Sequence, residues 1–178
     1  DTPGESFQTY TNPKFKAEGG YSKVAESAFV GALFTYAGPN YVQILNHLGK
    51  TDEAAKAQAE IDKMKKAMMD SAWDGDWFLR GFTGDGRAIG SHTAKEGKVH
   101  LESNAWAVVS GAATTQQGLS CMDAVNDWLY TPYGLMLNAP AFTTPDDGIG
   151  FVTRVYPGVK ENGAVFSHPN PWAWVAEC

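Results

Sequence analysis

The chain has 178 residues, 43% of them hydrophobic, and is long enough to bury one sizeable core. Its net charge of -6 and its lack of a Lys/Arg cluster argue against a nucleic-acid partner, because phosphate backbones are bound by concentrated basic surfaces. No run approaches the roughly 20 apolar residues of a membrane span, which argues against a membrane partner. The two cysteines, Cys121 and Cys178, are too few for a disulfide framework or a metal-ligand cluster, which predicts the reducing cytoplasm as the location.

The first third of the chain is expected to be a loop followed by helices. Residues 1–20 carry Gly, Pro, Thr and Lys without periodicity and therefore predict a loop. Apolar residues near helical spacing predict a helix over residues 22–37, which Gly38-Pro39 should stop. A short second helix is expected over residues 41–48.

The next segment has the most regular helical pattern. Thr51 is the expected N-cap, with acidic residues in the following turn, and an Ala/Lys/Glu/Met-rich stretch extends from it to about Ser71. The methionines of this stretch, Met64, Met68 and Met69, are interpreted as core-filling side chains.

Shorter elements and long loops make up the rest. The Asp85-Gly86 pair predicts a tight hairpin turn between residues 77–82 and 87–89. Residues 130–167 lack a period and predict long functional loops. Further helices are expected over residues 104–113, over residues 118–129 and from near Pro171 onward. The alternation of helices and loops predicts a mainly α fold, an all-helical barrel or bundle.

The aromatic residues point to a possible ligand. Six Trp, seven Tyr and nine Phe are present, and several of the Trp stand beside Asp, Asn, Gly or Pro. Flat rings next to polar loop residues are typical of a pocket that binds a sugar, although large aromatics also fill the joints between helices. Composition alone favours neither interpretation.

Two neighbouring carboxylates are candidates for glycosidic chemistry, which needs an acid to protonate the leaving oxygen. Asp74 stands between Trp73 and Gly75, where the indole can partly desolvate the carboxyl and favour its protonated form. Asp76 is the second candidate, and a solvated acidic turn after the long helix is the alternative for both.

Other chemically active side chains are open to two interpretations. His168, just before the last predicted helix, either binds an anion with the N–H groups of the first helical turn or is a structural histidine. Glu161 is either a turn residue or an acceptor for a sugar hydroxyl. His92 and His100 have no third ligand at metal-like spacing, so no metal is expected. Cys121 is interpreted as a packed thiol.

Four segments together resemble glycoside hydrolase family 94, in the order in which that family has them. They are residues 73–80 (WDGDWFLR), 96–104 (EGKVHLESN), 156–163 (YPGVKENG) and 166–172 (FSHPNPW). The resemblance implies part of an (α/α)6 barrel with long loops and a short β-hairpin. It implies inverting phosphorolysis of a β-linked disaccharide, with inorganic phosphate as co-substrate and no cofactor.

Roles for individual residues follow from the same resemblance. It implies that Asp74 is the proton donor, that His168 binds phosphate and that Lys160 and Glu161 line sugar subsites, with Trp73 beside them. Phosphate is itself an anionic nucleophile, so a phosphorylase needs no second carboxylate to activate water. The absence of a placeable catalytic base from the sequence is therefore consistent with this assignment.

The expected substrate is N,N'-diacetylchitobiose, because residues 138–177 look most like the branch of the family that acts on it. Phe151 stands where the cellobiose branch tends to carry a Glu, and Val155 can tolerate an acetamido methyl group. Residues 2–8 and 25–27 look closer to the cellobiose branch, which keeps cellobiose as the alternative. An inverting hydrolase and a non-catalytic sugar-binding module are the further alternatives.

The resemblance also bears on domain organisation. Family members are several-fold longer, so residues 1–178 are expected to be a fragment of the catalytic barrel domain, without the N-terminal β-rich domain and the remaining barrel. A homodimer is expected for the full-length enzyme. Part of a barrel exposes apolar helix faces, which predicts poor stability of the fragment alone.

Overall fold

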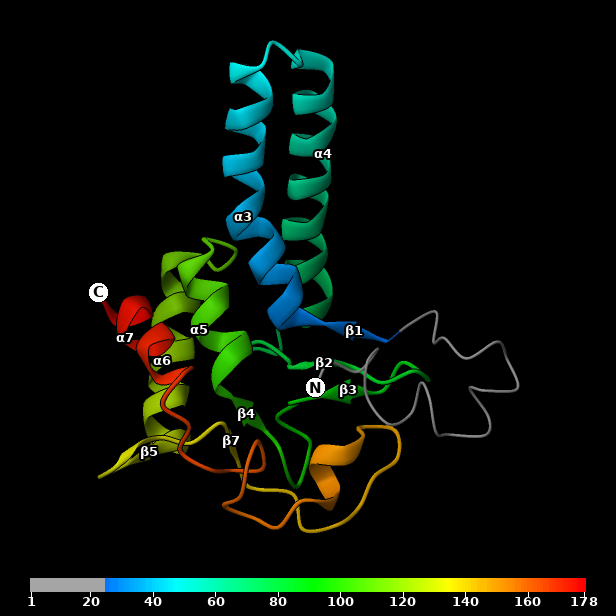
Figure 1. Ribbon diagram of the computed structural model, residues 1–178. Coiled ribbons are helices and arrows are strands. Elements are labelled where there is room, and N and C mark those ends of the chain that lie inside the picture. The colour runs from blue at the N-terminus through cyan, green and yellow to red at the C-terminus, as the bar shows by residue number, and fades with distance from the viewer. Residues whose placement is uncertain (1–24) are drawn as a thin grey trace.

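The computed structural model describes residues 25–178, in which most regular structure is helical (Figure 1). A long antiparallel pair, α3 and α4, stands on a body built from the shorter helices α5, α6 and α7, with short strands and loops at its base (Figure 1). The helices are α3 (Ala28–His47), α4 (Thr51–Ala67), α5 (Leu101–Val109), α6 (Thr115–Leu129) and α7 (Asn170–Glu177). The prediction of a mainly α fold is thus confirmed, whereas the predicted loop over residues 1–20 lies outside the described part.

The prediction that Gly38-Pro39 ends a helix is wrong, because α3 contains both residues. The helix continues through both residues to His47, and Gly38 is a packing position: a Cβ built on it would lie 2.6 Å from Cδ1 of Ile61 in α4. Pro39 removes one backbone hydrogen bond, but the packing of α3 along α4 keeps the helix continuous. Tertiary contact therefore overrides two residues that usually terminate helices.

Helix α4 begins at Thr51, after the N-cap residue Lys50, one residue from the predicted cap. It passes into a five-residue π-helix, Met68–Ala72, that ends directly before Trp73. Met68 is buried and Met64 and Met69 pack against the core, which confirms their interpretation as core residues. π-helical turns inside α-helices are frequent next to functional segments.

Within residues 25–178, the strands are all two residues long and form three small sheets. The predicted hairpin is confirmed as β2 (Gly81–Phe82) paired with β3 (Ala88–Ile89), with β1 (Glu26–Ser27) added antiparallel on the other side of β2. Beyond this hairpin, β4 (Val99–His100) pairs with β7 (Asn138–Ala139), and β5 (Tyr130–Thr131) pairs with β6 (Gly134–Leu135). The region predicted as long loops thus contains these short strands and a 3-10 turn, η2 (Phe151–Arg154).

The core lies where α3, α5, α6 and α7 meet. Phe78, Val99, Leu101, Cys121 and Val125 are fully buried within it. The helices contact one another in series, α4 on α3, α3 on α5, and α5 on both α6 and α7. Residues 25–178 contain no closed ring of helices, so the (α/α)6 barrel stays a prediction for the whole protein.

A helix that crosses a bilayer needs about 20 predominantly apolar residues. In residues 25–178, no helix is both long enough and apolar enough to cross a membrane.

Candidate functional site

Asp74 lies in a tight turn that begins where the π-helix ends. Trp73 and Phe78 form an isolated antiparallel bridge, and the Asp74 N–H donates to the carbonyl of Trp77 at 3.0 Å. Gly75 in this turn has a φ of 96°, a left-handed value that a glycine adopts at little cost. The turn therefore projects residues 74–76 from a rigid base.

Asn104 in α5 anchors this turn to the core. Its side chain is fully buried, accepts from the Phe78 N–H at 2.9 Å and donates to the carbonyl of His100 at 2.8 Å. The Trp73 ring, which is half-buried, packs edge-on against Phe78 with 5.1 Å between the ring centroids. The turn is thus fixed to the core by hydrogen bonds and by ring packing, and a sugar-binding role for Trp73 stays a prediction.

The two candidate carboxylates lie in different environments. The Asp74 side chain is 19% exposed. Its Oδ2 accepts from the backbone N–H of His92 at 2.6 Å and lies 2.8 Å from the ring Nδ1 of the same residue. Asp76 is exposed, and its backbone carbonyl accepts from the Ser120 hydroxyl at 2.7 Å. The His92 contacts orient the Asp74 carboxyl, and its role as proton donor stays a prediction.

Sequence reasoning missed His92 as the partner of Asp74. The two residues are 18 positions apart, and His92 lies in the loop that follows β3. This loop is itself held by a turn in which the Ala94 N–H donates to the Ser91 carbonyl at 2.9 Å. Helical and strand periodicities carry no information about such a loop-to-loop pair.

Lys160 and Glu161 occupy a second tight turn, over residues 156–163. Lys160 has a φ of 50°, and a bridge between Val159 and Asn162 closes the turn. Asn162 is fully buried, accepts from the Phe142 N–H at 2.7 Å and donates to the Phe142 carbonyl at 2.8 Å. Both predicted sugar-binding side chains are exposed, on a turn that the buried Asn162 amide fixes to the body.

The remaining predicted sugar contact, Val155, stands at the C-cap of η2 and is half-buried. Its carbonyl accepts from Nδ2 of Asn162 at 2.7 Å. Val155 therefore lies at the base of the turn that carries Lys160 and Glu161, and the three residues belong to one region of the structure.

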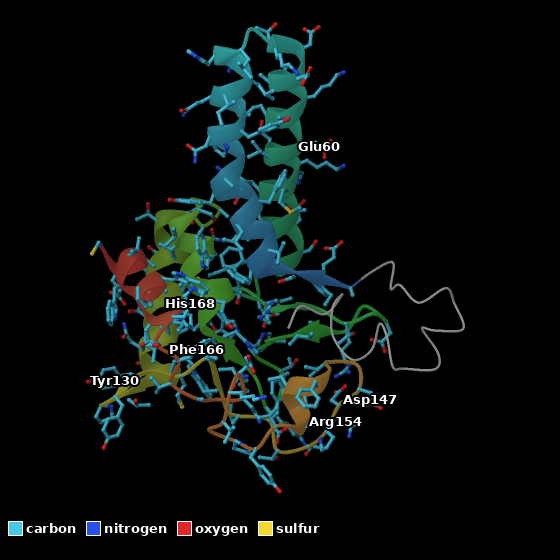
Figure 2. All side chains as sticks on the ribbon, in the orientation of Figure 1. Glu60, Tyr130, Asp147, Arg154, Phe166 and His168 are labelled. Atoms are coloured by element: carbon cyan, nitrogen blue, oxygen red, sulfur yellow. The ribbon has the colours of Figure 1, made fainter. Side chains whose placement is uncertain are left out.

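His168 lies just before α7, as predicted, although the helix begins at Asn170 (Figure 2). Its imidazole is exposed and packs edge-on against Trp172 at 4.9 Å and against Phe166 at 6.0 Å between ring centroids. Asn170 fixes this segment by accepting from the Leu135 N–H at 2.8 Å. Among residues 25–178, no hydrogen bond or ring contact joins Asp74, Glu161 and His168 to one another.

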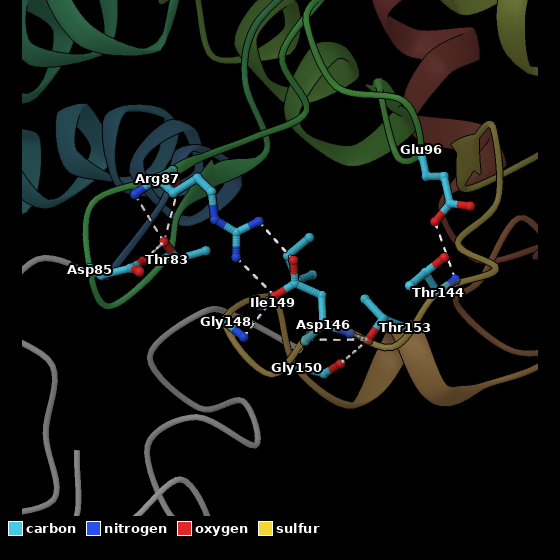
Figure 3. Close-up of polar contacts among 10 residues, drawn as sticks. All are labelled: Thr83, Asp85, Arg87, Glu96, Thr144, Asp146, Gly148, Ile149, Gly150 and Thr153. Carbon is cyan, nitrogen blue, oxygen red and sulfur yellow. Dashed lines mark hydrogen bonds and ion pairs between the residues drawn. The ribbon is translucent and has the colours of Figure 1, made fainter. Parts of the chain in front are cut away.

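A second network, which sequence reasoning also missed, holds residues 143–154 against the hairpin (Figure 3). Arg87 in the hairpin makes two bonds to the Asp146 carboxylate, at 2.7 and 2.8 Å. The hydrogen bond and charge of Arg87 lower the pKa of Asp146. Glu96 accepts from the hydroxyl of Thr143, and this bond lowers the pKa of the Glu96 carboxyl. The network positions the loop that carries Phe151 and Val155.

Burial raises the pKa of the Cys121 thiol to about 12, which confirms its interpretation as a packed thiol. In the described part of the chain, no group of three or more His, Cys, Asp or Glu side chains is arranged to hold a metal ion.

Comparison with known proteins relates this geometry to one family. The model of the glycosyl hydrolase 94 superfamily, catalytic domain, matches residues 12–178. Over 154 residues, 85% of the chain, the sequence is 53% identical to N,N'-diacetylchitobiose phosphorylase of Vibrio furnissii and 50% identical to that of Vibrio proteolyticus. Over 116 residues, 65% of the chain, it is 38% identical to solabiose phosphorylase of Paenibacillus borealis. These matches cover 19%, 19% and 15% of the relatives, so the chain spans about a fifth of their length.

Proposed function

This chain belongs to the glycoside hydrolase 94 superfamily, and we propose that the protein containing it cleaves a β-1,4-linked disaccharide with inorganic phosphate and inversion. The proposed substrate is N,N'-diacetylchitobiose, and the products are N-acetylglucosamine 1-phosphate and N-acetylglucosamine. The observation that carries this proposal is the identity of 50 to 53% with two N,N'-diacetylchitobiose phosphorylases over 85% of the chain. The identity with solabiose phosphorylase is lower, at 38%, which supports the substrate choice.

Residues around η2 support a substrate with acetamido groups. Phe151 is 49% exposed and Val155 is half-buried. This region therefore offers apolar surface, and Phe151 stands where the cellobiose branch tends to carry a Glu. An apolar wall leaves the hydroxyls of an acceptor glucose without partners, but it can contact an acetamido methyl group. The polar turn with Lys160 and Glu161 adjoins it and is proposed to bind sugar hydroxyls.

The proposed reaction is a single displacement at the anomeric carbon. A phosphate oxygen attacks this carbon from one face, the bond to the leaving oxygen breaks on the other face, and an acid transfers its proton to that oxygen. Asp74 is the proposed acid of this chain. Oδ2 of this carboxyl already contacts His92, so these contacts are proposed to rearrange when substrate binds.

His168 is the proposed phosphate ligand. It is exposed, it lies at the start of α7, and its ring is oriented by Trp172. A cationic or N–H-donating group at that point stabilises an anion, and the helix start adds a favourable dipole. No cofactor enters the proposed reaction.

We propose residues 1–178 as part of a catalytic (α/α)6 barrel, in a homodimeric full-length enzyme that also has an N-terminal β-rich domain. Exposed apolar side chains on α3 support the proposal that further elements of the full-length enzyme pack against this helix. They include Val30, Phe34, Tyr41 and Ile44, which are 42 to 57% exposed. Apolar side chains in such number along one helix are typical of surfaces that other elements cover.

The test is an assay of the full-length enzyme with N,N'-diacetylchitobiose and phosphate, in which release of N-acetylglucosamine 1-phosphate supports the proposal. Omitting phosphate should abolish turnover. Turnover of cellobiose alone would overturn the substrate, free sugar released without phosphate would identify a hydrolase, and sugar binding without turnover would identify a binding module.

A further inference from the structure

Residues 87–96 contact the turn that carries the proposed proton donor. This segment begins beside the hairpin turn, includes β3 and continues into the loop after it. His92 contacts Oδ2 of Asp74. The Gly90 carbonyl accepts from Nε1 of the buried Trp77, in the same turn as Asp74, at 2.7 Å. The segment therefore holds this turn from one side.

The same segment also holds the loop over residues 143–154 (Figure 3). Arg87 makes two bonds to the Asp146 carboxylate, at 2.7 and 2.8 Å. Oε2 of Glu96 accepts from the backbone N–H groups of residues 143–144, at 3.0 and 3.3 Å. The segment thus joins the turn of the proposed acid to this loop.

Polar contacts contribute much of the attachment of this loop to the hairpin. A cavity of about 350 Å3 lies between them, lined by residues of the segment and by residues 142–149. A cavity lacks the contacts of a filled core, so it does little to fix the loop. The ends of the loop are fixed elsewhere, because Nδ2 of Asn162 donates to the carbonyls of Phe142 and Val155, at 2.8 and 2.7 Å. The bonds from the segment therefore position the part between these ends.

The Arg87–Asp146 pair is fixed at both ends by its own surroundings. The Arg87 N–H donates to the hydroxyl of the buried Thr83 at 2.9 Å, which sets Arg87 in the hairpin turn. Asp146 accepts from the Gly148 N–H at 2.8 Å, and its own N–H donates to the Thr153 hydroxyl at 2.8 Å. Exposed ion pairs are usually weak, partly because two long side chains must be ordered. Here much of that ordering is already made, so the pair can transmit position from the hairpin to the loop.

We propose that Arg87 and Glu96 are positioning residues, which keep the 143–154 loop at a fixed place relative to Asp74. This rests on the proposed function, in which Phe151 of the loop contacts the acceptor sugar and Asp74 protonates the oxygen that leaves with that sugar. Proton transfer requires this oxygen within hydrogen-bond reach of the acid, so the loop and the acid must be held at a fixed separation. Both positioning residues act through the loop rather than on the substrate.

The test is the kinetics of the full-length enzyme in the direction of synthesis, from N-acetylglucosamine 1-phosphate and N-acetylglucosamine. Arg87→Gln removes the ion pair, and Glu96→Ala removes the acceptor for the N–H groups of residues 143–144. Each variant should lower kcat/KM for N-acetylglucosamine by about fivefold, the effect of a partly exposed charged contact. The KM for N-acetylglucosamine 1-phosphate should be unchanged, because its phosphate is proposed to bind at the start of α7.

Two further variants test whether the geometry of the contact matters. Arg87→Lys keeps the charge but cannot donate two parallel bonds, so its kcat/KM should lie between those of wild type and Arg87→Gln. Lys95→Gln is the matched control, because it removes an exposed cation from the same segment and should leave both constants unchanged.

Hydrogen exchange followed by mass spectrometry separates positioning from general destabilisation. Arg87→Gln and Glu96→Ala should exchange faster over residues 143–154 and at the wild-type rate over α4. Wild-type kcat/KM in both folded variants would overturn the proposal, as would an equal rise in the KM for both sugars. If one variant fails to fold, the other carries the test alone.

A wild-type enzyme that does not join the two sugars would overturn the proposed function, and the role towards the acceptor with it. Hydrogen exchange would then decide whether Arg87 and Glu96 hold the loop. Faster exchange over residues 143–154 in the two variants supports this, and unchanged exchange overturns it.

Discussion

His92 contacts one oxygen of Asp74 twice: its backbone N–H donates to Oδ2 at 2.6 Å, and its ring Nδ1 lies 2.8 Å from the same oxygen. The carboxylate thereby joins the 73–78 turn to the loop after β3. The same contact bears on chemistry and on structure, because it orients the candidate proton donor and also ties two loops together. The roles of Asp74 and Asp76 can be separated by mutation.

Replacing the candidate acid is expected to abolish most turnover. Asp74→Asn in the full-length enzyme should lower kcat for phosphorolysis by roughly 10² to 10⁴-fold, the range of a general acid. Asp76→Asn is the control, because this side chain is exposed in the same turn and should retain near wild-type kcat. Wild-type kcat in a folded Asp74→Asn variant would show that the proton donor is another residue.

The close packing of Gly38 against Ile61 predicts that a side chain added at Gly38 will clash, and that shortening Ile61 will relieve the clash. Gly38→Ala places a methyl group 2.6 Å from Ile61 Cδ1, so we expect it to destabilise the protein by about 1–3 kcal/mol. Ile61→Ala alone should also destabilise, by about 2–5 kcal/mol, because Ile61 is 1% exposed. In the double variant the cost of Gly38→Ala should largely disappear, which denaturant unfolding of the four proteins measures. Strict additivity would contradict the packing of α3 on α4 described above.

The Arg87–Asp146 pair predicts a pH-dependent contribution to stability. Its hydrogen bond and charge lower the folded-state pKa of Asp146 below the ordinary value of 3.8. The contribution is therefore fully present above pH 3.8 and is lost as the pH falls through the folded-state pKa. We expect Asp146→Asn to cost less than about 1 kcal/mol at pH 7, because the pair is partly exposed. Unfolding free energies at pH 7 and pH 2.5 check this, and an equal difference at both values would contradict it.

The two cysteines should differ in reactivity towards iodoacetamide. Cys121 is fully buried with a pKa of about 12, so it should stay unmodified in the native protein at pH 8, whereas the exposed Cys178 should react. In denaturant both should react. Mass spectrometry of the labelled peptides makes the comparison, and native labelling of Cys121 would contradict its place in the core.

Local features of the sequence were sufficient for several elements. Asp52 and Glu53 mark the start of α4, because acidic residues in the first turn stabilise a helix start, whereas the predicted N-cap Thr51 is wrong, since Lys50 takes that position. The Asp85-Gly86 pair marks the β2–β3 hairpin, because a tight turn needs residues that tolerate unusual backbone angles. Four ordered motifs identified the family, which the match over residues 12–178 confirms.

Relationships between distant residues were decided only by the tertiary structure. The local sequence at Gly38 predicts the end of a helix. In the structure Ile61 packs in the space that the absence of a side chain at Gly38 leaves, and α3 continues. Neither the contact of His92 with Asp74 nor the position of Asn138 opposite His100 has a signature in spacing, since each pair joins loops or strands brought together by folding. Sequence by itself therefore determined the family, the mainly α fold and the regular local elements, because these depend on neighbouring residues. The hydrogen-bond partners and the cavity depend on which surfaces meet, and only the folded chain decides that.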